Sequence, residues 1–120
     1  MNLPDIIAQV KNHPDFDKAG MLLCHNGVVR RTSRDGREVS GLKIDVDHDK
    51  LKQVIAEYKQ TPGIIEIVCE IAENKDLAVG DDVMVLIVAG DIRDTVITVL
   101  KDALNAIKTT VTTKTEYFVG

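Results

Sequence analysis

The feature that most limits the fold of this chain is a nearly uninterrupted apolar run from Val83 to Ala89. The run is too short to cross a bilayer, which takes about 20 apolar residues in a helix. Its lack of polar alternation is typical of a strand that is buried on both faces. We therefore expect this segment to form the central strand of a sheet that helices cover.

Apolar spacing along the rest of the chain predicts three helices and four further strands. Asn2 and Asp91 are expected to cap the first and third helices, the third continuing through Lys108, and the second helix is expected over residues 48–60. The further strands are expected over residues 19–29, 38–47, 64–72 and 109–119. This order predicts an α+β fold, a two-layer α/β sandwich with a mixed, mainly antiparallel sheet, in a single domain over residues 1–120.

The first two strands border a basic loop, residues 30–37, that contains four arginines. We expect these strands to pair as a hairpin with the loop at its tip. The Asn26-Gly27 pair is a common turn signal, but strand-forming Val28 and Val29 follow it. We therefore interpret it as a bulge within one longer strand.

The composition argues against several classes of protein. Its 44% hydrophobic and 28% charged residues are typical of a globular chain, and its four aromatic residues require an aliphatic core. With 15 Lys and Arg against 19 Asp and Glu, the net charge of −4 argues against a general binder of nucleic acid or anionic membranes. Two cysteines provide no disulfide framework and no signal segment is recognised, so we expect a cytoplasmic protein.

Signals for a metal site or a cysteine nucleophile are weak. The three histidines, His13, His25 and His48, fall in different predicted elements without the spacing of metal ligands. Cys24 and His25 are neighbours in a predicted strand, so their side chains point to opposite faces. We therefore expect a buried cysteine and a half-exposed histidine rather than a catalytic pair.

Three cationic features are candidates for a binding site. The first is the loop with Arg30 and Arg31, and the second is Arg93, a cation where the dipole of the third helix favours an anion. The third is Lys108 at the end of that helix, with Lys114 after it. The arginine loop could simply be a solvated surface loop, and Lys108 could simply cap the end of its helix. Neither structural role explains Arg93. If the fold brings these groups together, they form an anion site.

These features, in this order, resemble the large, catalytic subunit of molybdopterin synthase. A Gly-x-Val-Arg stretch ends the first strand at residues 27–30, and a Leu-x-x-Gly-Asp turn occupies residues 77–81. An arginine opens the long helix at position 93, a lysine ends it at position 108, and a second lysine follows at position 114. The resemblance covers residues 19–118.

The resemblance implies an enzyme that inserts two sulfurs into a cyclic pyranopterin monophosphate to form the dithiolene of molybdopterin. The sulfur would come from the C-terminal thiocarboxylate of a small ubiquitin-like partner with a Gly-Gly tail, and no cofactor or metal would be needed. Lys108 would be the principal catalytic lysine and Lys114 would assist it. The substrate phosphate or the tail carboxylate would be bound by Arg30, Arg31 and Arg93.

The resemblance also implies a homodimer, because members of this family dimerise through their large subunits. Arg93 and Lys108 are fifteen residues apart, which is about 22 Å along a helix. One small ligand cannot reach both within one chain. The two residues are then joined by a dimer mate, are joined by an extended ligand such as a peptide tail, or serve separate sites. We expect the first of these, a site shared across the dimer in which Arg93 of one protomer faces Lys108 of the other.

Two departures from the family favour an alternative function. Ile92 stands where the family has a histidine, and Thr109 to Thr113 replace an aromatic segment between the two lysines. The alternative is a non-catalytic homodimeric binding module of the same fold that has lost the pterin chemistry. A phosphate- or nucleotide-binding regulator that uses the arginine loop is less favoured, because no glycine-rich cradle accompanies the loop.

Overall fold

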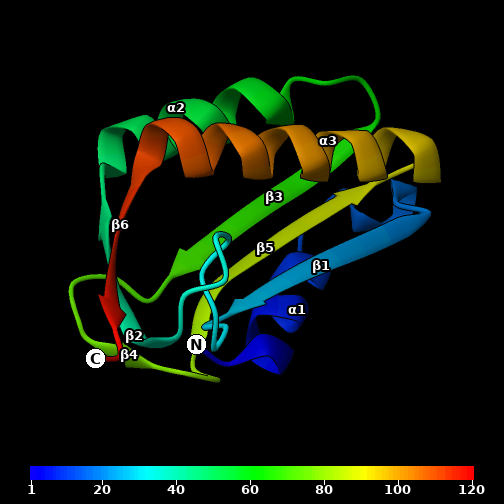
Figure 1. The fold of residues 1–120 in the computed structure, drawn as a ribbon. Coiled ribbons are helices and arrows are strands. Elements are labelled where there is room, and N and C mark those ends of the chain that lie inside the picture. Colours follow the sequence, from blue (N-terminus) through cyan, green and yellow to red (C-terminus); the bar gives the residue numbers. More distant parts are fainter.

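The computed structural model describes residues 1–120 and contains two three-stranded sheets. In the first sheet, β5 (Asp82–Gly90) lies between β1 (Met21–Val28) and β3 (Ile64–Ile71), and both pairs are antiparallel. Helices α2 (His48–Lys59) and α3 (Arg93–Ala106) cover one face of this sheet, and α1 (Leu3–Lys11) covers the other (Figure 1). The predicted central strand is therefore confirmed.

The apolar run in β5 fills two separate cores because neither face of the strand meets water. Leu86 and Val88 pack with the residues of α2 and α3, whereas Val85 and Ile87 pack against α1. None of these four side chains is more than 1% exposed. The continuous apolar pattern thus follows from helices on both sides of the sheet.

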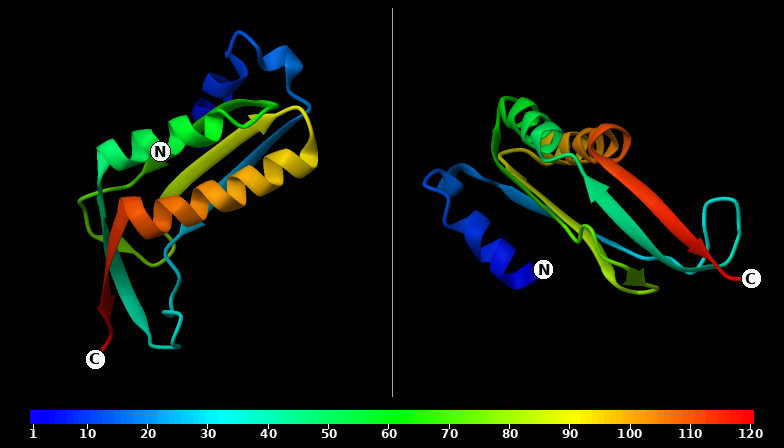
Figure 2. Two further views of the ribbon diagram at one scale, coloured as in Figure 1. Left: turned by 90° about the horizontal axis from the view of Figure 1, so that it is seen from above. Right: turned by 90° about the vertical axis from the view of Figure 1, so that its left-hand side faces the viewer.

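The second sheet lies at one end of the molecule and gives it an elongated shape of 51 × 26 × 24 Å (Figure 2). In this sheet β2 (Val39–Val46) lies between the short β4 (Leu77–Ala78) and β6 (Thr112–Phe118), again with antiparallel pairs. The α+β class with mainly antiparallel strands is confirmed. A third apolar cluster supports this sheet: Val29, Leu42, Ile44, Ala72 and Leu77.

The predicted hairpin between the first two strands is wrong. β1 pairs with β5 and β2 pairs with β6, so the two strands belong to different sheets. The loop closes on itself instead, through a bridge between Thr32 and Glu38. Because β5 is buried, its backbone N–H and C=O groups require hydrogen-bond partners on both edges, and β1 provides them on one edge. The bulge is confirmed, since β1 runs through Asn26-Gly27 and its register shifts between Gly27 and Val28.

The capping predictions succeed for the first helix and fail for the third. The Asn2 side chain accepts a hydrogen bond from the amide of Asp5 at 3.2 Å, as expected. The N-cap of α3 is Ile92, which provides no side-chain cap, and not Asp91. The Asp91 amide donates to the carbonyl of Gly63, and its carboxylate fills the space beside that glycine, whose φ is +91°. Asp91 therefore fastens the start of α3 to the turn before β3.

The long helix ends differently from the prediction. The α-helix stops at Ala106 and continues as one π-helical turn, Ile107–Val111, so β6 begins at Thr112 and not at residue 109. Ile107 and Val111 are 0% and 3% exposed. The wider turn lets side chains four residues apart both enter the core before the chain turns into the strand. None of the helices is long and apolar enough to cross a membrane.

Candidate functional site

Lys108 lies on the π-helical turn and is free of protein partners. Its side chain makes no hydrogen bond and no ion pair, and the residue is exposed. The hydroxyls of Thr109 and Thr110 donate to the carbonyls of Asn105 (2.9 Å) and Ala106 (2.7 Å). Because these hydroxyls cap the end of the helix, the ammonium of Lys108 is not needed there. Its charge is available to a ligand.

Lys114 lies on the inward face of the second sheet. It stands directly opposite Ile44, a residue of β2 that is 5% exposed and packed in the core. Cross-strand partners project to the same side of a sheet. Glu116 shares this face, and its carboxylate lies 3.8 Å from Nζ of Lys114. The lysine is therefore held beside the core by a weak ion pair, with about half of its side chain exposed.

His25 is a site residue that sequence reasoning missed. In β1, Met21 and Leu23 pack on the side of α2 and α3, whereas Leu22 and Cys24 pack on the side of α1. The alternation places His25 on the side of α3, and Lys108 lies close enough to act on it. Burial, and then the positive charge of Lys108, lower the pKa of His25 below its ordinary value. Only the strand alternation was visible in the sequence, because the two residues are far apart along the chain.

The neighbouring Cys24 lies on the opposite face from His25, as predicted. Burial raises the pKa of its thiol. Burial also raises the pKa of Cys69 to about 12. Both thiols are therefore protonated at neutral pH and are poor nucleophiles.

The arginine loop is a compact turn whose arginines are all exposed. Nε of Arg30 donates to the carbonyl of Thr32 at 2.7 Å, which leaves its remaining guanidinium N–H groups free. The guanidinium of Arg37 stacks on the ring of Phe118 at 3.6 Å and ties the loop to the end of β6. Arg31 is exposed and makes no ion pair.

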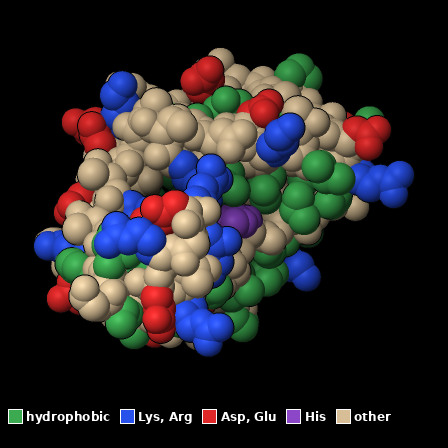
Figure 3. Space-filling view, in the orientation of Figure 1, with side chains coloured by type: hydrophobic (Ala, Val, Ile, Leu, Met, Phe, Trp, Pro, Cys, Tyr) green, Lys and Arg blue, Asp and Glu red, His purple; other side chains and the backbone are tan.

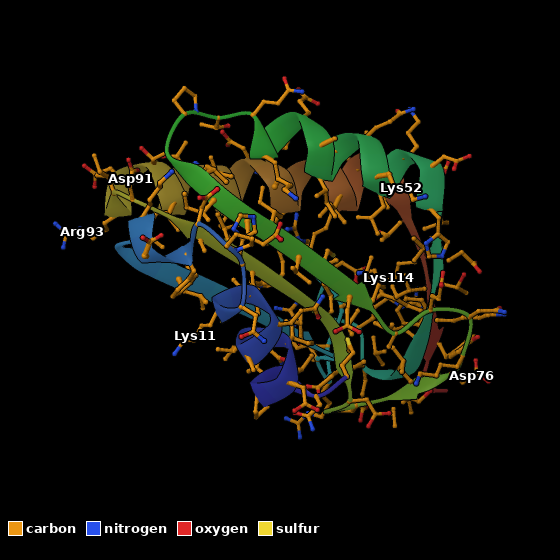
Figure 4. The ribbon with its side chains drawn as sticks, turned by 180° about the vertical axis from the view of Figure 1, so that it is seen from behind. Lys11, Lys52, Asp76, Asp91, Arg93 and Lys114 are labelled. Carbon is orange, nitrogen blue, oxygen red and sulfur yellow. The ribbon has the colours of Figure 1, made fainter.

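Arg93 lies apart from the other predicted site residues. It is the first residue of α3, is exposed, and makes no ion pair. Figure 4 shows it at one end of the molecule, well away from Lys114. One chain therefore does not bring Arg93 to Lys108 or Lys114. The shared dimer site stays a prediction.

The cations nearest the middle of the molecule gather on one face. Figure 3 shows Lys and Arg side chains around a histidine, in a hollow beneath α3 and beside the arginine loop. No three His, Cys, Asp or Glu side chains are grouped so that they could hold a metal ion. Two other hollows, around the loops between β3 and β5, are lined by carboxylates including Glu73, Asp76 and Asp81. An anion is therefore best accommodated beneath α3.

Comparison with known proteins points in one direction. The model of the MoaE protein family matches residues 2–110. No curated protein sequence matches significantly.

The fold is similar to those of solved proteins whose names refer to molybdopterin synthesis. Molybdopterin synthase from Staphylococcus aureus is 21% identical, with a TM-score of 0.73 over 86% of this chain and 77% of that one. A molybdopterin biosynthesis MoaE protein from Burkholderia ambifaria is 18% identical, with a TM-score of 0.78 over 99% and 82%. A complex of subunits 1 and 2 of molybdopterin-converting factor from Helicobacter pylori is 13% identical, with a TM-score of 0.72 over 99% and 84%. At these identities the likeness establishes the fold.

Proposed function

The chain belongs to the MoaE protein family, and from this we propose that it is the large subunit of a molybdopterin synthase. Family membership supports a role in molybdenum cofactor biosynthesis. The reaction we propose is sulfur transfer from the thiocarboxylate of a small partner to a cyclic pyranopterin monophosphate. The observation that carries the proposal is the free ammonium of Lys108, which neither caps its helix nor pairs with a carboxylate.

The cations beneath α3 suit the charges of both reactants. Lys108 would hold and activate the thiocarboxylate, because a cation beside the sulfur donor stabilises negative charge that develops during transfer. Lys114 would assist from β6, where its ammonium lies 3.8 Å from the carboxylate of Glu116. Arg30 and Arg31 would bind the substrate phosphate, since guanidinium N–H groups match phosphate oxygens in pairs. The basic loop would thus bind the pterin and Lys108 would act on the sulfur.

The proposed sulfur donor is a small ubiquitin-like protein that ends in Gly-Gly. The Helicobacter pylori relative is a complex of two different subunits, which supports a small-subunit partner for this chain. A tail of two glycines is narrow and extended, so it could pass along the side of α3 to reach Lys108. Helical spacing places partly exposed Leu100 and Leu104 on the same side as Lys108, and they would line this path.

A homodimer would supply the remaining cation. Arg93, Ile97 and Lys108 fall on one side of α3 because they are four and eleven residues apart, close to whole helical turns. Ile92 and Ile97 are 60% and 47% exposed. Antiparallel packing of α3 against its copy would bury these isoleucines and place each Arg93 near Lys108 of the partner subunit.

Two observations favour the second candidate, a homodimeric binding module without catalysis. Ile92 is an apolar, exposed residue where the resemblance calls for histidine. Thr109 and Thr110 use their hydroxyls on the end of α3 and cannot replace aromatic rings that would stack on a pterin. Such a module would bind the small partner or the pterin without forming product.

Reconstitution separates the two candidates. The purified protein is incubated with a thiocarboxylated small partner that ends in Gly-Gly and with the pterin precursor. Formation of the dithiolene product is expected, and a partner with an ordinary C-terminal carboxylate is the control. Binding of partner and pterin without product, under conditions in which a competent enzyme reacts, would establish the binding module instead.

A further inference from the structure

The end of β6 is joined to the arginine loop by contacts that the proposed roles do not explain. Cζ of Arg37 lies 3.6 Å from the centre of the Phe118 ring, which is a cation–π contact. One residue further on, the amide of Val119 donates to the carbonyl of Glu38 at 3.0 Å. The loop and the end of β6 lie at the same end of the molecule (Figure 2). Two segments that are far apart in the sequence thus form one structural unit.

Backbone pairing extends this unit to Arg31. Val39 is the register partner of Phe118, and its amide donates to the carbonyl of Arg31 at 2.8 Å. Beside this bond, Thr32 and Glu38 form an antiparallel bridge. The chain at residues 38–39 therefore lies between the end of β6 on one side and residues 31–32 on the other. The base of the loop depends on β6 as its outer strand.

The tip of the loop is closed on itself. The amide of Ser33 donates to the carbonyl of Arg37 at 2.8 Å, and the amide of Arg37 donates to Oγ of Ser33 at 3.2 Å. The side-chain hydrogen bonds of residues 30–37 all stay within the loop. The stack of Arg37 on Phe118 is therefore the side-chain contact that joins the loop to the second sheet.

The Phe118 ring is presented from an anchored strand. The hydroxyl of the preceding Tyr117 donates to the carboxylate of Asp76 at 2.7 Å. The hydroxyl of Ser40 donates to the carbonyl of Tyr117 at 3.2 Å. These bonds hold the end of β6 against both the loop before β4 and the start of β2, so the ring offers Arg37 a fixed surface.

We propose that Phe118 is a positioning residue that holds the arginine loop in the form that binds the substrate phosphate. The inference rests on the proposed function, which assigns the phosphate to Arg30 and Arg31. With Arg37 stacked, the base of the loop is closed and the backbone of Arg31 is fixed. A ligand that meets a loop already in place loses less conformational entropy on binding. Phe118 supports binding of the pterin and takes no part in the chemical step.

Hydrogen exchange of residues 30–39, followed by mass spectrometry, tests the contact without any ligand. We expect exchange to be about two- to fivefold faster in Phe118→Ala, the scale of a cation–π contact at an exposed site. Phe118→Tyr keeps a ring and should exchange at the native rate. Arg37→Lys should resemble Phe118→Ala, because an ammonium lacks the planar stacking surface of a guanidinium. Exchange in β5 should be unchanged in all variants, which confirms that they are folded.

Arg34→Ala is the matched control. It removes the same charge from the same loop, but Arg34 is exposed and its side chain has no hydrogen bond or ion pair. Exchange of the loop should therefore stay at the native rate in this variant. An equal acceleration in Arg34→Ala and Arg37→Lys would show that charge, and not stacking on Phe118, holds the loop.

Calorimetric titration with cyclic pyranopterin monophosphate measures the consequence for binding. The Kd should rise by about two- to fivefold in Phe118→Ala and Arg37→Lys, and it should stay native in Phe118→Tyr and close to native in Arg34→Ala. In the sulfur-transfer assay the KM for the pterin should rise by the same factor while kcat is unchanged. A purely structural role would speed loop exchange and leave the Kd and the KM at their native values.

Three results would overturn the positioning role: native loop exchange in Phe118→Ala, faster exchange with a native Kd, or weaker binding that Phe118→Tyr does not restore. The two proposals also fail separately. Product formation with a native Kd in Phe118→Ala leaves the enzyme in place and removes the positioning role. Pterin binding that depends on the Phe118 ring, without any dithiolene product, has the reverse meaning.

Discussion

Arg93 is the first residue of α3 and Lys108 lies on the π-helical turn that follows its last residue, so the two cations are separated by the whole length of the helix. If Arg93 serves the same small ligand as Lys108, the two must come from different protomers. The oligomeric state is therefore part of the proposed mechanism.

We expect a homodimer at micromolar concentration that Ile97→Lys disrupts. Ile97 is 47% exposed, and a lysine there would place a charge in the proposed apolar contact between the two α3 helices. Light scattering should give about twice the chain mass of 13.2 kDa for the native protein and the chain mass for the variant. Thr98→Lys, one position along the same helix and exposed, is the matched control. A native protein that is monomeric throughout this range would contradict the shared site.

Arg93→Ala is expected to separate binding from stability. The side chain is exposed and unpaired at a helix N-terminus, so its removal should change the free energy of unfolding by less than about 0.5 kcal/mol. Binding of a phosphate-bearing ligand should weaken by about 1.5–3 kcal/mol, the range for a charge-assisted hydrogen bond. Urea unfolding and calorimetric titration measure the two quantities. Unchanged affinity in a protein that is shown to be dimeric would remove Arg93 from the site.

Leu86→Ala is expected to be among the most damaging single changes. The side chain is 0% exposed at the centre of β5 and packs in the larger core. Its truncation should lower the free energy of unfolding by about 3–4 kcal/mol through lost burial and a residual cavity. Urea unfolding measures the loss, with Thr98→Ala on the surface of α3 expected within about 0.5 kcal/mol of the native value. A loss below about 1 kcal/mol would contradict the central position of β5.

The cysteines provide a prediction about pH. With a pKa of about 12, the Cys69 thiol stays protonated in the native protein well above the pH at which it ionises in the unfolded chain. Its contribution to stability is complete below a pH of about 8.5 and is lost as the pH rises toward 12. Iodoacetamide should therefore modify Cys69 at pH 8 only after unfolding, as mass spectrometry would detect. Rapid modification in the native state would show that the thiol is more accessible than the fold allows.

The sequence pattern was sufficient for elements whose local signals are strong. β5 was recognisable because seven consecutive residues lack polar alternation, and α1 because Asn2 and Pro4 mark its first turn. Asp91 was predicted as the N-cap of α3 because Asp is frequent at that position. In the structure its carboxylate packs against the turn at Gly63 instead, since a glycine leaves room for it.

Relationships between distant segments were not visible in the sequence. Alternation in β1 and β2 tells which side chains are buried and does not tell which strand is the neighbour, so the false hairpin was as consistent with the pattern as the true pairing. The same holds for the site. Lys108 was selected by its place at a helix end, but His25 comes under the influence of its charge only because the fold sets β1 beneath the π turn.

The most direct test of the account is single-turnover sulfur transfer by Lys108→Ala beside Lys101→Ala. Both lysines are exposed and lie two helical turns apart on the same side, but only Lys108 lowers the pKa of His25. With the thiocarboxylated partner and the pterin precursor, we predict that Lys108→Ala slows product formation by at least about 100-fold, while Lys101→Ala stays close to the native rate. An active native protein whose rate survives Lys108→Ala would contradict the account.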